Sequence, residues 1–345
     1  MAYTDIDKPS EYFNTTAYTG DGVAGRNLTT STFQPDWVWI KSRSDTDNHR
    51  LVDAVRGATK HLESDNTGAE QTSSNVTAFT STGITLSSNG AVNANAETYV
   101  SWNWLAGGTG VSNTDGSITS TVSANTTSGF SIVSYTGTGA NATVGHGLGV
   151  APSVVIVKSR SGVFNWGVYH SSIGNTKYLE LNETTATQIS STFWQNTSPT
   201  SSVFSLGSNN TVNQSSGTYI AYCFAEKKGF SKFGSYTGNG NVDSPFIYLG
   251  FKPAFMIFKR TDSAVDWTMY DNKRIGYNPN NYKLRPNLSN AEYSTAGYFE
   301  ADIVSNGFKI RTSDAEVNTS GGTYIYMAFA ENPFTTSTGI PTTAR

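Results

Sequence analysis

The sequence predicts an all-β protein made of three tandem repeated β-sandwich domains of jelly-roll-like architecture, and three observations predict it. The 345 residues include 46 Thr, 42 Ser, 33 Gly and 30 Asn, and Thr, Asn and Gly are poor helix formers. The chain also has 18 Tyr, 18 Phe and 7 Trp, too many aromatic residues for a chain that buries no core. The third observation is a pattern that occurs three times.

The pattern begins with a Y-T-G-x-G turn, continues through a proline into an apolar strand ending in lysine, and closes on a T-Y strand. Lys158 lies 117 residues after Lys41, and Lys259 lies 101 residues after Lys158. The tyrosines of the turns keep the same two offsets: Tyr18, Tyr135 and Tyr236. A period near 100 residues is the size of a complete β-sandwich domain. A lysine at a strand end is ordinarily solvated, and the recurrence in three copies leaves open an ion pair common to the repeats.

The repeat sets the expected domain boundaries. We expect a first domain over residues 1–107, a second over 130–228 and a third over 229–334, followed by a C-terminal tail over 335–345. Residues 108–129 are nearly all small and polar, without hydrophobic periodicity in their first half. That composition is typical of a Gly/Ser/Thr-rich linker.

Several local patterns predict individual elements. Ser153–Lys158 is apolar and β-branched, as in a buried strand, and Tyr219–Phe224 alternates aromatic and small residues, as in a strand with one buried face. Asn306–Gly307 between two strand-like runs predicts a hairpin. The one plausible helical piece is Leu51–Leu62, and we expect no helix longer than about three turns.

Charge and cysteine content exclude several classes of protein. The net charge is −3 and no Lys/Arg-rich stretch occurs, so nucleic acid is not an expected partner. A single cysteine, Cys223, excludes an intrachain disulfide and a Cys-based zinc site. No run has the length of a membrane helix, and Met1–Ser10 has no apolar signal-peptide core. We expect a soluble protein made in a cytosol, with no cofactor, no metal and no membrane insertion.

The motifs together resemble a known family. They are K-P-S-E-Y-F-N-T at the start, the Y-T-G-x-G turns, the P-x-x-V-x-I-K-x-R strands, S-S-V-F-S-L-G and the T-Y-I-A-Y-x-F-A-E ending. From Lys8 to about Phe334 the chain resembles repeat-containing virion proteins of tailed phages of marine bacteria and cyanobacteria, usually described as tail fibre-like or structural proteins. The resemblance supplies no catalytic or binding residues.

The resemblance implies a structural and interaction protein of a phage particle, a tail fibre or tail appendage made in the bacterial host cytoplasm. Its expected partners are other virion proteins and a host-surface polysaccharide or lipopolysaccharide. Two alternatives stay open: a capsid decoration, cement or head-fibre protein and, more weakly, a carbohydrate-binding or polysaccharide-degrading tailspike. We expect self-association as a trimer, because strand edges need cover and appendages bind a symmetric particle.

The joints between domains suggest a division of labour. The linker over 108–129 predicts a flexible first domain that docks to the virion. Ala225–Gly229 joins the other two domains with almost no slack, which predicts one rigid outward unit.

Candidate catalytic residues are better explained by the repeat. His49 occupies the position of Trp166 and Trp267 in the other copies, which indicates packing. Glu226 and Glu331 close the F-A-E motif in two copies, which indicates a structural role. We therefore predict that the protein is not an enzyme. Three loosely spaced acids without a calcium-loop pattern are interpreted as solvated: Asp262, Asp266 and Asp271.

The aromatic residues divide into core and surface candidates. Trp37 and Trp39, like Trp102 and Trp104, are two residues apart and point to one face of a strand, which favours burial. Trp194 lies in a loop-like segment and is the best exposed candidate for stacking on a sugar. The candidate surface or glycan contacts are Trp194, Tyr277, Tyr282, Arg274 and Arg285.

Overall fold

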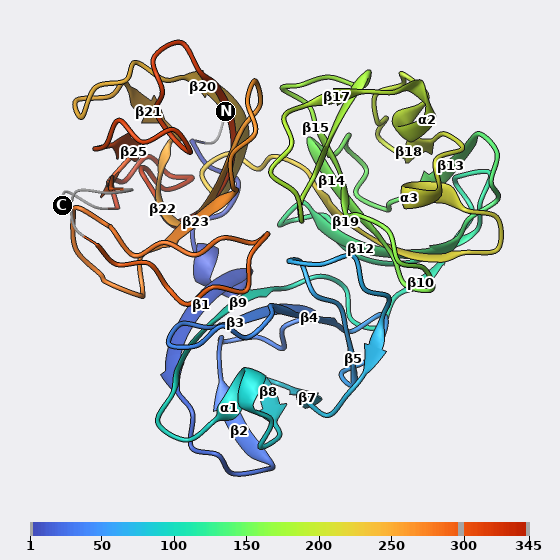
Figure 1. The fold of residues 1–345 in the computed structure, drawn as a ribbon, viewed down its shortest axis with the longest axis horizontal. Helices are drawn as coiled ribbons and strands as arrows, with labels where there is room; N and C mark the ends of the chain where they lie inside the picture. Colours follow the sequence, from blue (N-terminus) through green and yellow to red (C-terminus); the bar gives the residue numbers. More distant parts are fainter. Residues whose placement is uncertain (1–2, 296–299, 343–345) are drawn as a thin grey trace.

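The computed structural model describes residues 3–295 and 300–342. The chain is nearly all β, as predicted, with antiparallel strands throughout the named sheets (Figure 1). The helices in these ranges are each a single turn: η1 (Pro9–Glu11), α1 (Gly90–Asn93), α2 (Ser191–Trp194) and α3 (Asn210–Asn213). Among the described residues, no helix has the length and apolar character needed to cross a membrane.

One four-stranded order occurs in three parts of the chain, which we call units 1, 2 and 3. In unit 1 the order is β1 (Phe13–Thr19), β9 (Thr98–Trp104), β3 (Trp37–Ser42), β4 (Arg50–Asp53). In unit 2 it is β12 (Phe130–Thr136), β19 (Thr218–Phe224), β14 (Val154–Ser159), β15 (Gly167–His170). In unit 3 it is β20 (Ser231–Thr237), β26 (Thr323–Pro333), β22 (Phe251–Arg260), β23 (Thr268–Asp271).

A smaller sheet completes each unit. Unit 1 has β2 (Arg26–Thr29), β8 (Gly83–Leu86) and β7 (Val76–Thr80), unit 2 has β13 (Ala142–Gly145) and β18 (Val203–Leu206), and unit 3 has β21 (Phe246–Tyr248), β25 (Gly307–Ile310) and β24 (Ala301–Val304). In each unit the two sheets share a cluster of buried residues between them. The arrangement is that of a β-sandwich.

The register of the strands supports the repeat found in the sequence. The three lysines pair with equivalent residues of the T-Y strands: Lys41 with Val100, Lys158 with Ile220 and Lys259 with Ile325. Stacked tyrosine pairs recur beside them, with ring centroids 5.2, 5.2 and 5.0 Å apart: Tyr18–Tyr99, Tyr135–Tyr219 and Tyr236–Tyr324.

The local predictions have different outcomes. The hairpin at Asn306–Gly307 is confirmed, since β24 and β25 pair across Ser305 and Asn306. The helix over Leu51–Leu62 is wrong: Arg50–Asp53 is β4 and Lys60–His61 is β5, which pairs with β6 (Gln71–Thr72). Val52 of this segment pairs with Val38 of β3 and is fully buried, and this packing overrides the weak helical pattern.

The linker predicted over residues 108–129 is also wrong. Val111–Asn113 forms β10 and Ser120–Asn125 forms β11, and both extend the unit 2 sheet beyond β12. Ile118 and Val122 are 6% and 4% exposed, so the segment contributes to the core. Because the residues around Ile118 and Val122 are small and polar, the sequence showed no strand periodicity here. The segment forms strands because the edge of β12 offers unpaired backbone groups.

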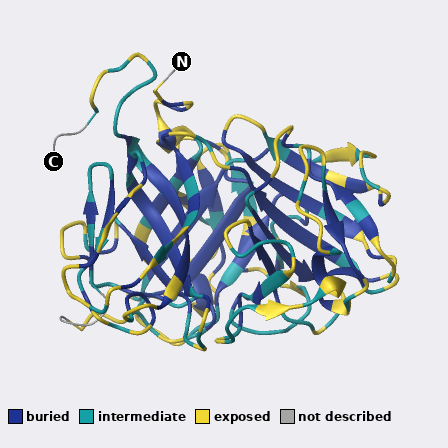
Figure 2. Ribbon diagram, turned by 90° about the horizontal axis from the view of Figure 1, so that it is seen from above, coloured by how far each residue is buried: buried dark blue, intermediate teal, exposed yellow. Residues whose placement is uncertain are grey.

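A second kind of core lies where the three units meet. Aromatic side chains from all three units pack in one buried cluster, and Figure 2 shows the long central strands buried along most of their length. Its large aromatic members include Phe13, Trp37, Trp39, Trp102, Trp104, Phe130, Trp166, Tyr222, Phe224, Phe255, Trp267 and Phe329. The burial predicted for the tryptophan pairs is confirmed. The prediction of one buried face for Tyr219–Phe224 is wrong, because the shared core covers the other face.

Rings from different units are in direct contact in this shared core. Trp37 of unit 1 stacks on Tyr222 of unit 2 at 4.3 Å, and Phe224 of unit 2 contacts Phe329 of unit 3 at 5.7 Å. Phe255 of unit 3 lies 5.4 Å from Trp102 of unit 1. No unit can therefore bury its aromatic face alone.

The end of the chain folds back on its beginning. In the C-terminal tail the Ser337 amide and hydroxyl both donate to the Asp7 carboxylate at 2.6 Å. The last three residues of the expected tail, 343–345, lie outside the described residues. Both ends of the chain are drawn close to unit 3 (Figure 1).

The shared core predicts that the three units unfold together. Phe255→Ala should lower the free energy of unfolding by about 3–5 kcal/mol, the usual cost of a large buried cavity, while leaving one transition. Calorimetry checks this through equal calorimetric and van't Hoff enthalpies. The control is Val242→Ala, which is 59% exposed and should have little effect. Separate transitions for separate units would contradict the prediction.

Candidate functional site

The three units are joined by a ring of equivalent hydrogen bonds. In each, a ring nitrogen of one unit donates to a backbone carbonyl of another: Trp166 Nε1 to Glu63 O at 2.9 Å, Trp267 Nε1 to Glu180 O at 3.0 Å, and His49 Nε2 to Arg285 O at 3.0 Å. Unit 2 thus binds unit 1, unit 3 binds unit 2, and unit 1 binds unit 3. The ring is closed.

His49 takes the place of a tryptophan in this ring, as its sequence position predicted. The side chain is fully buried, and Trp39 Nε1 donates to its Nδ1 at 2.8 Å. Nδ1 is therefore the acceptor, which leaves the proton on Nε2 for the Arg285 carbonyl. Burial, together with the Lys41 charge, lowers the pKa of His49 to about 3. A neutral buried imidazole with both nitrogens bonded is a packing residue.

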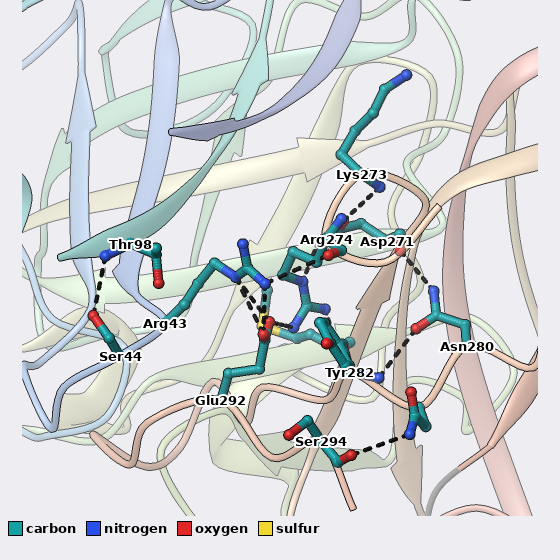
Figure 3. A network of polar contacts seen from close by, with 12 residues as sticks. Arg43, Ser44, Thr98, Asp271, Lys273, Arg274, Asn280, Tyr282, Glu292 and Ser294 are labelled. Carbon is teal, nitrogen blue, oxygen red and sulfur yellow. Dashed lines mark hydrogen bonds and ion pairs between the residues drawn. The ribbon is translucent and has the colours of Figure 1, made fainter. Parts of the chain in front are cut away.

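Ion pairs close the interface between unit 3 and unit 1 (Figure 3). The Glu292 carboxylate accepts from Arg43 of unit 1 at 2.8 Å and from Arg274 of its own unit at 2.9 Å. Arg274 in turn donates to Asp271 at 2.6 Å, and Trp102 Nε1 of unit 1 donates to the same carboxylate at 3.1 Å. Arg274, Asp271 and Trp102 are almost fully buried. Burial opposes the charge of Arg274, but Asp271 and Glu292 hold its pKa above the usual value.

The interface between unit 1 and unit 2 repeats this arrangement. Glu70 accepts from Arg160 of unit 2 at 2.9 Å and pairs with Arg56 at 3.4 Å, while Arg56 donates to Asp53 at 2.5 Å. The Tyr222 hydroxyl of unit 2 donates to Asp53 at 2.9 Å. Burial raises the pKa of Glu70, but its arginine partners outweigh burial and lower it. The same arrangement of buried charges therefore occurs at two of the three interfaces.

The interface between units 2 and 3 has no such network at the equivalent positions. Ile173 stands where unit 1 has Arg56, and Thr187 where it has Glu70, each 117 residues further on. The Thr187 amide and hydroxyl donate to Thr261 O at 3.0 and 2.9 Å. A hollow of about 390 Å³ lies at this interface, and Ile173, Thr187 and Thr261 form part of its lining. Hydrogen bonds such as those of Thr187 and the short joint at Ala225–Gly229 hold this interface, without carboxylate–arginine pairs at the equivalent positions.

The three repeat lysines are buried, so the prediction of solvated strand ends is wrong. Each is 0% exposed, and each ammonium group donates to two loop carbonyls: Lys41 to Ser42 O and Asp45 O, Lys158 to Thr67 O and Phe164 O, and Lys259 to Thr184 O and Val265 O. Thr67 belongs to unit 1 and Thr184 to unit 2, so two of the lysines cross an interface. Loops of the neighbouring unit replace the water that a strand end would otherwise meet.

Two of the predicted surface contacts are wrong because their side chains are buried. Trp194 is 2% exposed and packs against Tyr169 and Phe193. The Ser190 side chain caps α2 and the helix turns Trp194 inward. Arg274 lies in the network described above. Asp271, interpreted as a solvated acid, is fully buried there as well.

The other three candidates differ in exposure. Tyr282 lies under the Arg43 guanidinium, 5.8 Å from the ring centroid, and Arg285 pairs with Asp266 at 3.3 Å and Glu316 at 2.6 Å. Tyr277 is 69% exposed. It lines a groove of about 630 Å³, here called the Tyr277 groove, with Lys252, Lys273, Glu331, Asn272, Asn278 and Asn280.

One group of acids in the described residues is close enough to share a cation. Carboxylate oxygens of Asp45, Asp47 and Glu97 lie within 4.8 Å of one another. Asp45 is exposed and the other two are partly exposed. The sequence reasoning missed this group because Glu97 is 50 residues from Asp47.

The fold and the interfaces define an all-β protein whose three units are closed around one core. The chain belongs to the family described as "Domain of unknown function (DUF7483)", whose profile matches residues 8–333. The match spans all three units. No curated protein matches the chain.

The charge network predicts a strong effect of Glu292→Gln. The substitution leaves Arg43 and the buried Arg274 without their shared carboxylate, and breaking a buried pair costs about 3–5 kcal/mol. Chemical denaturation should show a loss at the lower end of that range, since Arg43 is 17% exposed. Glu11→Gln is the control, because Glu11 pairs with Lys8 on the surface and should change stability by under about 1 kcal/mol. Equal effects of both substitutions would contradict a role for the network.

The buried lysines predict that stability rises with pH. Burial lowers the pKa of Lys158 to about 7 and of Lys41 and Lys259 to about 8, whereas unfolded lysines stay protonated to about pH 10. Between about pH 7 and pH 10 the unfolded state therefore binds more protons, and the free energy of unfolding increases.

Lys158→Met tests this effect by removing one titrating group. Urea unfolding from pH 7 to 9.5 should show a pH slope reduced by up to about 1.4 kcal/mol per unit. Lys8→Met, whose side chain is 73% exposed in the native protein, should leave the slope unchanged. An unchanged slope in Lys158→Met would rule out a neutral buried lysine.

Proposed function

We propose that this protein is a structural and interaction protein of a tailed bacteriophage particle, a tail fibre or tail appendage. The observation that carries the proposal is the closed ring of three units around one aromatic core. An appendage must hold its position relative to the particle, and a body without internal hinges does so. The assignment to a phage particle rests on the sequence motifs that resemble tail fibre-like proteins.

The ring changes how the protein would attach. The sequence favoured a separate first domain that docks through a flexible linker. Residues 108–129 instead form β10 and β11, and unit 1 is bonded to both other units. Attachment would therefore use a face of the whole body. The short joint at Ala225–Gly229 and the charge networks both contribute to that rigidity.

The proposed partners are other virion proteins and a host-surface polysaccharide or lipopolysaccharide, without nucleic acid or membrane insertion. We retain a trimer in the proposal, on the argument from strand edges. The aromatic faces of the units are not an argument for a trimer, because one chain covers them itself. Capsid decoration is the second candidate, since a rigid body that binds through one face also suits a capsid surface.

The proposal predicts that the protein is found in purified phage particles. Mass spectrometry of density-purified particles should detect it in stoichiometric amounts, and gold-labelled antibody should mark the tail. Label on the head would favour capsid decoration. Absence from particles that contain the major capsid and tail proteins would reject a virion role of either kind.

A further inference from the structure

A second groove lies at the joint between units 2 and 3, on the side where the ends of the chain meet. It has a volume of about 610 Å³, and we call it the Tyr248 groove. Four segments form its walls: the N-terminal segment with Tyr3 and Asp5, the joint from Glu226 to Ser231 with Lys232, the end of β21 at Tyr248, and Phe334 and Thr335.

The N-terminal wall is fixed to the joint by backbone contacts. The Asp5 amide donates to Lys228 O at 2.9 Å, and the Lys228 amide donates to the Asp5 carboxylate at 3.0 Å. The Thr4 hydroxyl donates to Lys228 O at 2.8 Å. Gly229 has a φ of +77°, and a side chain there would collide with Thr4. This close approach lets the N-terminal segment lie against the joint as a wall.

Two tyrosine rings in the groove are available to a ligand. Tyr3 is 62% exposed and Tyr248 is 55% exposed. Lys232 holds Tyr248 in place, because its ammonium group donates to Tyr248 O at 2.8 Å and lies 5.5 Å from the ring centroid. An exposed aromatic ring with a fixed position is a platform for the apolar face of a sugar ring.

Glu226 provides an acceptor beside these rings. It is exposed, and no hydrogen bond or ion pair joins its carboxylate to another residue in the described part of the chain. Its counterpart in unit 3, Glu331, is held by Lys252 at 2.6 Å and Lys273 at 3.9 Å. Unit 2 has Ala151 and Ser172 at those two lysine positions, 101 residues earlier. Unit 2 therefore lacks the two lysines that pair with the equivalent carboxylate in unit 3.

The charges of the groove indicate the class of ligand. Two carboxylates, Asp5 and Glu226, balance two ammonium groups, Lys228 and Lys232. A groove with no net charge has no preference for an anion or a cation. Carboxylates accept hydrogen bonds from hydroxyl groups and ammonium groups donate to them, while the tyrosines cover apolar ring faces.

We propose that the Tyr248 groove binds an uncharged oligosaccharide, with Tyr3 and Tyr248 stacking on sugar rings and Glu226 accepting from a hydroxyl group. The site deepens the proposed function, on which it rests for its biological setting, and it names the chemistry of the surface contact. It differs from the Tyr277 groove, where the corresponding carboxylate is already paired.

The test uses the full chain and a defined set of probes. These are neutral hexasaccharides, namely maltohexaose, isomaltohexaose, laminarihexaose, cellohexaose and mannohexaose, with hexagalacturonate as the acidic comparison. Saturation-transfer NMR followed by titration measures binding. At least one neutral probe should bind more tightly than the acidic one. Tyr3→Ala and Tyr248→Ala should each weaken that binding about fivefold, the scale of one aromatic contact, and Glu226→Gln should weaken it severalfold.

Matched variants in the other groove make the test specific. Tyr277→Ala and Glu331→Gln should leave the affinity unchanged, and all five positions lie at the surface or at its edge, so circular dichroism can verify folding. The proposal is overturned if no neutral probe binds, if the acidic probe binds best, or if the Tyr277 groove variants alone reduce affinity. Particle localisation is measured separately, so binding by a protein absent from particles would reject the virion role and leave the site standing.

Discussion

The rest of the structure depends on the burial of aromatic side chains where the three units meet. In each unit the four strands of the common order have two apolar faces, and the smaller sheet covers only one of them. The other face consists of rings such as Trp37, Phe224 and Phe255, which water would solvate poorly. Only the other two units cover it. Three sandwiches that share a core in this way behave as one body, although each has the length of an independent domain.

The polar interactions at the interfaces select the arrangement rather than drive it. Buried charges offset their desolvation only with good partners. Asp271 and Asp53 each accept from an arginine of their own unit and from an aromatic side chain of another unit, Trp102 Nε1 and the Tyr222 hydroxyl respectively. Units 1 and 3 have no direct chain connection, and their network closes the ring. Units 2 and 3 are joined by a short covalent connection and have Thr187 and Ile173 instead. At the equivalent positions, the charged network is therefore absent from this interface, where the short joint itself restricts separation of the units.

The sequence was informative about local structure within a unit and about residues that the repeat relates. Constant offsets between Lys41, Lys158 and Lys259 located equivalent strands. The tryptophans at the position of His49 in the other two units indicated that His49 is a packing residue. The sequence did not indicate that those lysines are buried, because two of them donate to carbonyls of a neighbouring unit, Lys158 to Thr67 O and Lys259 to Thr184 O. The prediction that Trp194 is exposed was wrong because its sequence neighbours are polar and lie on the outer side of the turn. The Trp194 side chain itself packs into the unit 2 core. Contacts between units leave no local pattern in the sequence.

The repeats agree at the positions that hold the fold and differ at the ends of the T-Y strands. The stacked tyrosines and the buried lysines occur in all three units, and these positions maintain the fold. The ends of the T-Y strands differ: Glu331 has two lysine partners, whereas unit 2 has Ala151 and Ser172 at the positions of those lysines. A paired carboxylate stabilises a surface slightly, while an unpaired one beside tyrosine rings is available to a ligand. Because the closed ring does not need these rim residues, they can change without loss of the fold, and different units can present different surfaces from one rigid body.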